Sequence, residues 1–371
     1  MAERQDGVRL APYTTLRVGG EARAFVVARD AGELAAVVGE ADRAGQPVLV
    51  LGGGSNLLIS DAGFDGLVVK VASRGVHVTE LDGHAEVTAE AGEDWDALVQ
   101  RAVTEGWSGV ECLSGVPGLV GATPIQNVGA YGQEVSQTVT GVRVYDREAG
   151  EIRDLRHDDC GFAYRDSVFK RHPDRYVVLA VTYTLARAEL SGPVAYQELA
   201  TRLGVELGAR TGLHDVRDAV IGLRRGKGMV LDPADPDTCS AGSFFTNPVL
   251  SAAEAADLER RSPGFPRWPM PEARVKVPAA WLIEHAGFPK GYRRGRARVS
   301  TKHTLALTNP GGHHVTGFPA DPRGVMGAVP EEHDAATAAD LVGLAREIRQ
   351  GVEAKFGVTL VNEPVLVGVT L

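Results

Sequence analysis

The sequence predicts an α+β protein in which short strands and amphipathic helices form three successive units. Three observations support this fold class. Strand-like apolar runs alternate with segments of helical periodicity along the chain. Two glycine-rich stretches interrupt them, at 52–54 and 113–132. The first of these leads into another strand-like run, whereas the glycine turn of a Rossmann fold opens a helix.

The first unit contains strands, one helix and a glycine turn. The run ARAFVVA predicts a strand. A helix is predicted after it from an apolar stripe on one helical face, formed by Leu34, Val37, Val38 and Ala41. PVLVL then predicts a buried strand that ends at the glycine run, and LLIS and GLVVKV predict two more strands.

The second unit combines a helix with a hairpin and a long strand. Asp94 is placed to cap a helix whose inner face holds Leu98, Val99, Ala102 and Val103. VTGVRVYD and IRDL predict a hairpin, and YVVLAVTYTLA predicts a long strand. Residues 113–132 hold five glycines and two prolines, too many for a regular element. We expect a close-packed loop around a flat ligand.

The third unit opens with the turn-forming run LDPADPDT and contains the helical segment AAWLIEHAG. Its last helix is strongly periodic, with one face formed by Leu341, Leu344, Ala345, Ile348, Val352 and Phe356. Residues 310–333 are rich in glycine, proline and charge, which predicts a surface insertion.

The composition is that of a globular protein with an acidic balance. The 371 residues are 44% hydrophobic and 23% charged, and the formal net charge is -9. Such a chain lacks the basic field that attracts nucleic-acid phosphates or a membrane surface, so we expect neither partner. An anionic substrate would need a local cluster of cationic side chains.

Neither an export signal nor a membrane span is evident, because no stretch approaches the roughly 20 apolar residues of a span. We therefore expect a cytoplasmic protein. Cys112, Cys160 and Cys239 show no CxxC spacing. They are interpreted as small buried apolar residues rather than as a disulfide framework or a thiolate metal site. Histidines lack HExxH spacing, so no metal is expected.

The glycines after PVLVL offer consecutive backbone N–H groups with little obstruction, which suits a diphosphate. A plain tight turn would give the same pattern. The second glycine stretch favours the ligand interpretation, since two loops of close approach predict one extended ligand between them.

The segment GLRRGKGM is not a P-loop, because its first glycine stands one residue too close and no Ser or Thr follows Lys227. Arg224, Arg225 and Lys227 still form a compact cationic cluster. A solvated charge run is an equal alternative. Arg165 in AYRDSVFKR and Ser243 in AGSFFTNP are candidates for catalysis. The alternatives are an ordinary salt-bridge partner for Arg165 and a cap or turn residue for Ser243.

Eight segments, taken in order, closely resemble the UDP-N-acetylenolpyruvoylglucosamine reductase (MurB) family. They are TTLRVGGEA, VLGGGSNLLISD, LSGVPGLVGATPIQNVGAYGQE, FAYRDSVFK, AGSFFTNP, AAWLIEHAGF, VSTKHTLALTN and VNEPVLVG. Together they span nearly the whole chain. The resemblance implies an FAD-binding fold of the vanillyl-alcohol-oxidase (PCMH) type. Its first subdomain would be 1–74 with the C-terminal strand 360–371, its second 75–225, and the α+β substrate-binding domain 226–359.

The same resemblance implies a set of residues around non-covalently bound FAD. The first glycine loop would cradle its diphosphate with Gly52, Gly53, Gly54, Ser55, Asn56 and Leu57. The second would line the flavin with Ser114, Gly115, Pro117, Gly118, Gly121, Ala122, Gln126, Asn127, Gly129, Ala130 and Tyr131. Thr123 departs from the small Ala or Ser of the family, a change that we expect to affect packing rather than chemistry.

The implied catalytic residues are three. Arg165 would stabilise an enolate with its guanidinium fork, and Ser243 would donate the proton to C2. Glu363 would stand beside this serine and reinforce the donation if protonated, since its apolar flanks, the strand-like VTLV and VLVGV, favour a raised pKa.

The implied substrate contacts surround these groups. Lys227 and Asn247 would bind the substrate diphosphate, and Tyr196 would belong to a flap found in one subclass of the family. Tyr164 and His303 complete the expected substrate-binding set.

The implied activity is the NADPH-dependent reduction of UDP-N-acetylglucosamine enolpyruvate to UDP-N-acetylmuramate in peptidoglycan precursor synthesis, and we expect a monomer. One alternative is another FAD oxidoreductase of the same fold, such as a sugar or alcohol oxidase. A second is a non-catalytic protein that binds flavin or a nucleotide sugar. The presence of Arg165, Ser243 and Glu363 favours the reductase over both.

Overall fold

The structure, a computed structural model, describes residues 3–314 and 335–371. The first sheet contains the N-terminal strands. The strand order is β1 (Arg4–Arg9), β2 (Glu21–Ala28), β5 (Phe64–Val71), β3 (Val48–Leu51). β1 and β2 are antiparallel, and β5 runs parallel to β2 and β3. The predicted helix is α1 (Ala31–Arg43), capped by the side chain of Asp30.

The second sheet is antiparallel and larger. Its order is β12 (Glu151–Arg156), β11 (Val139–Asp146), β13 (Tyr176–Arg187), β7 (His84–Glu90), β6 (Val76–Leu81), and β8 (Trp107–Ser108) also pairs with β13. The predicted hairpin and long strand are therefore confirmed. α2 (Trp95–Thr104) begins after Asp94, whose carboxylate accepts the Ala97 N–H at 2.8 Å, as the capping pattern predicts.

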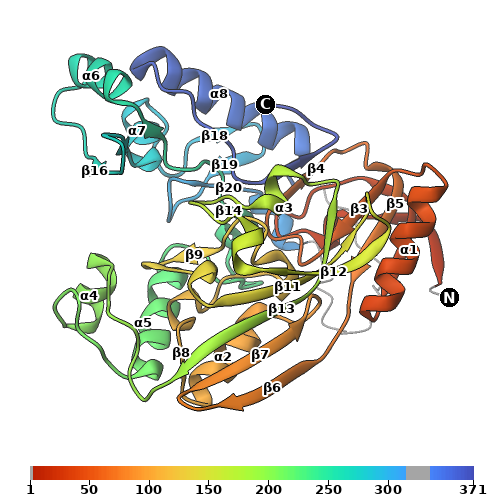
Figure 1. Cartoon of the computed structure of the whole chain (residues 1–371). Coiled ribbons are helices and arrows are strands. Elements are labelled where there is room, and N and C mark those ends of the chain that lie inside the picture. Colours follow the sequence, from red (N-terminus) through yellow and green to blue (C-terminus); the bar gives the residue numbers. More distant parts are fainter. Residues whose placement is uncertain (1–2, 315–334) are drawn as a thin grey trace.

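Helix α1 joins these two sheets into one core (Figure 1). It contacts β2 and β5 on one side and β13 on the other. At Gly39 a side-chain carbon would lie 2.5 Å from the Tyr145 hydroxyl, so only glycine allows this close approach of α1 to the second sheet.

The third unit packs several short strands against helices. One sheet has the order β14 (Ser240–Ser243), β20 (Ala306–Thr308), β19 (Ala297–Val299), β18 (Arg293–Arg294). Another has the order β15 (Val249–Leu250), β17 (Val275–Lys276), β16 (Trp268–Pro269). The helices are α6 (Ala252–Arg261), α7 (Ala279–His285) and α8 (Ala338–Phe356). All six apolar positions predicted for the last helix are buried, so its periodicity identified the packed face.

Shorter elements connect these layers. The helices are α3 (Val168–Arg171), α4 (Gln197–Leu203) and α5 (Leu213–Gly226), and the small strands are β9 (Gly129–Ala130) and β10 (Gln133–Glu134). Single 3-10 turns cover Ala11–Tyr13, Glu111–Leu113, Val120–Ala122, Val135–Gln137, His157–Cys160, Pro236–Thr238 and Pro310–His314. The stretch 113–132 is a loop with only short regular pieces, as its glycine content predicts.

The C-terminal segment returns to the start of the chain. β21 (Val365–Val367) runs parallel to β4 (Leu57–Ile59), directly after the first glycine loop. The strand expected before Glu363 is wrong, because VTLV forms no ladder. Instead, Val361 O accepts the Thr246 N–H, the Glu363 N–H donates to Phe244 O, and Pro364 has no N–H to continue a ladder.

Most of the predicted insertion 310–333 lies outside the described residues. The predicted domain boundaries stay a proposal. Among the helices of the described ranges, none has the length and apolar character to cross a membrane. The three cysteines are buried, as expected, and burial raises the pKa of Cys112 and Cys160 to about 12.

The two glycine loops touch through their backbones. A side-chain carbon on Gly53 would lie 2.7 Å from the Cα of Gly118, and one on Gly54, whose φ is +64°, would lie 2.0 Å from Tyr13 O. Gly52, one residue earlier, has no atom within 4 Å of the same position. The first and second sheets therefore approach each other where side chains are absent.

Gly53→Ala should lower the free energy of unfolding by about 1–3 kcal/mol, because the added methyl overpacks the contact with Gly118. Gly52→Ala is the matched control and should leave the unfolding midpoint unchanged, since its methyl enters open space. Thermal unfolding of both variants after removal of bound cofactor measures the difference. Equal unfolding midpoints for the two variants would contradict the close contact between Gly53 and Gly118.

Candidate functional site

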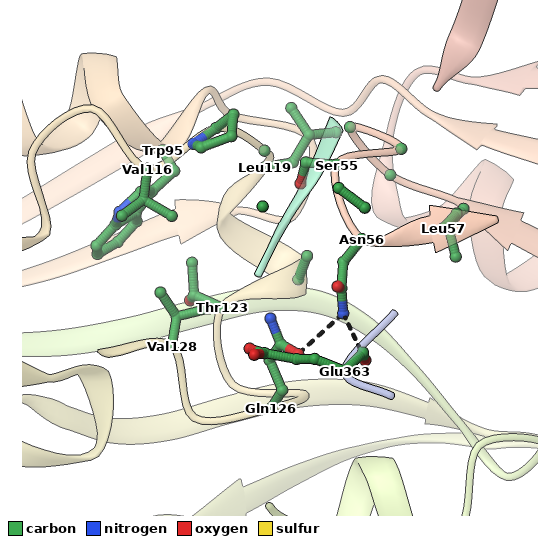
Figure 2. A pocket seen from close by; sticks show the side chains of 18 of the residues that line it. Ser55, Asn56, Leu57, Trp95, Val116, Leu119, Thr123, Gln126, Val128 and Glu363 are labelled. Atoms are coloured by element: carbon green, nitrogen blue, oxygen red, sulfur yellow. Dashed lines mark hydrogen bonds between the residues drawn. The ribbon is translucent and has the colours of Figure 1, made fainter. Parts of the chain in front are cut away.

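A cavity of about 280 Å³ lies between the two glycine loops and β14. Its lining comes from the first glycine loop, the second glycine loop, β14, the end of α5 and the C-terminal segment. Figure 2 shows Ser55, Asn56, Gln126 and Glu363 around this space. The Asn56 amide donates to Gln126 Oε1 at 2.9 Å and to Glu363 O at 3.3 Å, so one side chain ties three distant segments together.

A partly buried ion pair between Asp96 and Arg217 supports the second glycine loop. Asp96, in the first turn of α2, accepts the Gly115 N–H at 2.6 Å and two bonds from Arg217 at 2.7 and 2.9 Å. Burial by itself raises the pKa of the Asp96 carboxyl. The hydrogen bonds from Arg217 and Gly115 have the larger combined effect, so the pKa lies below its usual value. The loop is therefore fixed before any ligand binds.

A second cavity of about 210 Å³ adjoins the first and shares Gly52, Gly53 and Gly118 with it. Lys70 lines it, and its ammonium donates to Gly52 O at 3.0 Å and Val71 O at 3.1 Å. Burial lowers the pKa of Lys70 to about 8, with a smaller contribution from Arg74. Carbonyl oxygens leave the charge of this ammonium uncompensated, so the cation suits an anionic ligand.

Arg165 lines the main cavity in a strained conformation. Its φ is +54°, in the left-handed region that is unfavourable for a side-chain residue. The guanidinium donates to Asn127 O at 3.3 Å and Gly129 O at 2.6 Å, and the Lys170 ammonium donates to Arg165 O at 2.9 Å. The two guanidinium bonds hold the side chain against the second glycine loop.

Glu363 and Ser243 reach the same cavity from other elements. Glu363 Oε1 lies 3.5 Å from Arg165 Nε. Burial raises the pKa of Glu363, although Arg165 and Lys170 oppose the rise. Ser243 is the last residue of β14 and pairs with Ala306 of the neighbouring strand β20. The three predicted catalytic side chains therefore line one cavity, although up to 198 positions separate them in the sequence.

One group of rim residues surrounds Tyr164. Its ring lies 5.6 Å from the Arg165 guanidinium and 5.1 Å from the Lys276 ammonium. Burial raises the pKa of Tyr164, and a hydrogen bond with Asn247 partly offsets the rise. Asn247 also accepts the Ala279 N–H at 2.9 Å, so it caps α7 while it faces the rim.

A second group of rim residues surrounds Tyr131. Its ring meets Tyr196 edge-on at 5.5 Å, and the Lys227 ammonium lies 5.4 Å from its centre. Lys227 is ion-paired with Glu198 at 2.5 Å. Burial and the charge of Lys227 lower the pKa of His303 to about 4, which leaves a neutral imidazole able to donate and accept.

The predicted residues divide between the cavity wall and its support. Those that line the main cavity are Gly52, Gly53, Gly54, Ser55, Asn56, Leu57, Pro117, Gly118, Ala122, Gln126, Gly129, Arg165, Ser243 and Glu363. Those outside its lining are Ser114, Gly115, Gly121, Asn127, Ala130, Tyr131, Tyr164, Tyr196, Lys227, Asn247 and His303. Several of the latter support the wall: Gly121 packs on Ala91, where a side-chain carbon would lie 2.5 Å away.

Lys70 and Arg224 are cavity residues to which the sequence assigned no binding role. Lys70 gave no local signal, because its neighbours in the strand, Val68, Val69 and Val71, are apolar. Arg224 belongs to the predicted cationic cluster, and the alternative interpretation of a solvated charge is wrong for this residue. It lines the main cavity, donates to Gly115 O at 3.2 Å and Met229 O at 2.9 Å, and has its pKa lowered by burial. Arg225 is exposed and fits the solvated interpretation.

Thr123 is buried and its hydroxyl lies 2.8 Å from the Tyr183 hydroxyl. This contact anchors the second glycine loop to β13. Within residues 3–314 and 335–371, no cluster of three or more His, Cys, Asp or Glu side chains is arranged to hold a metal ion.

The two adjoining cavities fit an extended dinucleotide such as FAD. The contact of Gly53 with Gly118 forms a cradle that a side-chain carbon would fill. Lys70 and Arg224 bring positive charge to its two sides. A diphosphate is the group that such a backbone cradle with flanking cations binds best.

Comparisons with known proteins agree with this fit. Residues 22–156 match a family model described as an FAD binding domain, which confirms the predicted FAD-binding fold. Residues 233–318 match one described as the UDP-N-acetylenolpyruvoylglucosamine reductase C-terminal domain.

Curated relatives and a solved structure extend the likeness to the whole chain. The UDP-N-acetylenolpyruvoylglucosamine reductase of Thermobifida fusca (strain YX) is 55% identical, with 98% of each chain covered. That of Saccharopolyspora erythraea is 52% identical, covering 98% of this chain and 96% of the relative. The crystal structure of the enzyme from Thermus caldophilus superposes with a TM-score of 0.62 at 26% identity, covering 99% of both chains. The chain therefore belongs to the UDP-N-acetylenolpyruvoylglucosamine reductase family of FAD-dependent oxidoreductases.

Proposed function

We propose that the chain reduces UDP-N-acetylglucosamine enolpyruvate to UDP-N-acetylmuramate, with NADPH as the reductant. The observation that carries this proposal is the convergence of Arg165, Ser243 and Glu363 on one cavity beside the glycine cradle. The reaction belongs to peptidoglycan precursor synthesis, and we propose a cytoplasmic, monomeric enzyme.

FAD, when bound, would supply the hydride-transfer chemistry that links NADPH to C3 of the enolpyruvyl group. The cradle of Gly53, Gly54 and Gly118 would hold its diphosphate with backbone N–H groups. The second cavity, with Lys70, would take the more remote part of the cofactor. NADPH and the sugar substrate would use the remaining face of the site in turn.

Arg165 would stabilise the charge that develops when hydride reaches C3. The electron pair then moves onto C2 and the adjoining carboxylate, and a guanidinium matches this carboxylate with two parallel N–H groups. Its bonds to Asn127 O and Gly129 O fix the fork before the reaction, so little reorganisation is needed.

Ser243 would then donate its hydroxyl proton to C2, which forms the new C–H bond and leaves an alkoxide that regains a proton from Glu363 or water. A serine is a weak acid, so it donates only to a strongly basic carbon close by. The raised pKa of Glu363 keeps more of its carboxyl protonated near neutral pH than in a free side chain. Glu363 would thereby supply the proton that replaces the one lost by the serine.

Substrate binding would depend on the two rim groups. Lys227 would pair with the substrate diphosphate beneath Tyr196, and neutral His303 would offer one donor and one acceptor nearby. Tyr164 and Asn247 would border the opposite side.

An anaerobic visible spectrum of the purified protein tests the function. Bound flavin should bleach on addition of NADPH and recover on addition of UDP-N-acetylglucosamine enolpyruvate. Absence of flavin would favour the nucleotide-sugar binding alternative. Recovery only with oxygen would favour an oxidase of the same fold.

Ser243→Ala should separate the two halves of the reaction. Bleaching by NADPH should keep its rate, because no proton to C2 is involved. Recovery with the enolpyruvyl sugar should slow by roughly 100- to 10,000-fold, the usual contribution of a positioned proton donor. Stopped-flow absorbance measures both rates in one variant. Equal slowing of both halves would indicate misplaced flavin instead of a lost donor.

Turnover should fall with rising pH as Glu363 loses its proton. Because its pKa is raised, the protonated form persists to higher pH than in a free carboxyl and is lost only as the pH passes the raised pKa. Glu363→Gln is neutral throughout and should lack this descending limb. Glu90→Gln is the control, since burial raises the pKa of Glu90 too but the residue lies outside the cavity lining. A limb unchanged in Glu363→Gln would rule out this role.

A further inference from the structure

Lys227, the residue proposed to bind the substrate diphosphate, already has an anionic partner. Its ammonium lies 2.5 Å from Glu198 Oε2. The Lys227 side chain is 27% exposed and that of Glu198 is 40% exposed, so the pair lies at the rim and a ligand can reach it from solvent. An incoming diphosphate must therefore compete with this carboxylate.

The position of Glu198 is fixed by packing of its helix. Glu198 lies in the first turn of α4, two residues after Tyr196. The inner face of α4 is buried against α5 through Leu199 and Ala200, which share a core with Val216 and Val220. Lys227 caps the C-terminal end of the same α5. The two helices thus hold the two charges at pairing distance.

The pair is also connected to the aromatic rim. Lys227 lies over the ring of Tyr131, and Tyr131 meets Tyr196 edge-on. Tyr196 and Glu198 therefore lie on one short segment that contacts Lys227 both directly and through Tyr131. A ligand that binds Lys227 in place of Glu198 breaks the direct contact between this segment and Lys227 and leaves the contact through Tyr131.

We propose that Glu198 is an internal counter-ion that occupies Lys227 in the absence of substrate and limits affinity for the diphosphate. The proposal rests on the proposed function, because it takes Lys227 as the diphosphate site. A carboxylate beside a bound diphosphate is repelled by it, so binding breaks the pair and loses its energy. The lost energy of the ion pair weakens the binding of every diphosphate ligand at this site, so each ligand dissociates faster. Fast dissociation suits a site that two substrates use in turn.

Removing the charge of Glu198 should tighten diphosphate binding. With UDP as the probe and the FAD-loaded enzyme at fixed ionic strength, Glu198→Gln should lower the dissociation constant by about two- to five-fold, the range of a partly exposed ion pair. KM for the enolpyruvyl sugar should fall in parallel. Glu206→Gln, which removes an exposed charge after the same helix, is the matched control and should leave UDP binding unchanged.

A double-mutant cycle assigns the effect to the pair. In a Lys227→Met background UDP should bind more weakly, and adding Glu198→Gln should then produce no tightening. Calorimetric titration of UDP into the four proteins gives the coupling. Weaker or unchanged UDP binding in Glu198→Gln, or tightening that persists without Lys227, would overturn the proposal.

The outcome is separable from that of the proposed function. If the wild-type enzyme turns over the enolpyruvyl sugar with NADPH but Glu198→Gln does not tighten UDP binding, only the counter-ion role fails. If the wild-type enzyme shows no such turnover, the proposed function fails, whatever the UDP titrations give.

Discussion

The contact between the backbones of Gly53 and Gly118 is the constraint on which the site depends. It brings loops from two different sheets closer than any side chain would permit. The main cavity lies on one side of this contact and the second cavity on the other, and both use the same glycines as their shared wall. An extended ligand that fills both cavities must pass along exposed backbone N–H groups at this point.

Polar contacts hold the second glycine loop in addition to the apolar packing of Val116 and Val120. Asp96 connects the second glycine loop to α2 and, through Arg217, to α5. The same helix α5 delivers Arg224 to the cavity and ends at Lys227. One helix therefore supplies both a support of the second glycine loop, Arg217, and the cations Arg224 and Lys227, so an acidic chain has a local positive site here.

The chemistry of the site follows from where the chain returns. Glu363 is placed by the pairing of β21 with β4, which begins directly after the first glycine loop. Ser243 is placed by β14 and Arg165 by the loop before α3, so each group comes from a different layer. Their shared cavity lowers exposure to water, which raises the pKa of Glu363 and strengthens the field of Arg165.

The rim behaves differently from this interior. Tyr196 is exposed there, and Lys227 and Glu198 are partly exposed, at the ends of the packed helices α4 and α5. Charges at such a position exchange partners at little energetic cost. The pair of Lys227 with Glu198 is thus suited to reversible ligand binding, whereas the deeper contact of Arg165 with Glu363 is suited to fixed geometry.

The sequence by itself determined the features whose signals are local. The periodicity of α8, the cap at Asp94 and the two glycine loops were all readable within short windows, because helical periodicity, capping and glycine geometry depend on near neighbours. Tertiary structure alone decided which charges are buried and paired. Arg224 faces a cavity and Lys227 meets Glu198 because of partners that lie 109 and 29 positions away, and burial of a charge depends on such distant partners rather than on its own neighbours in sequence.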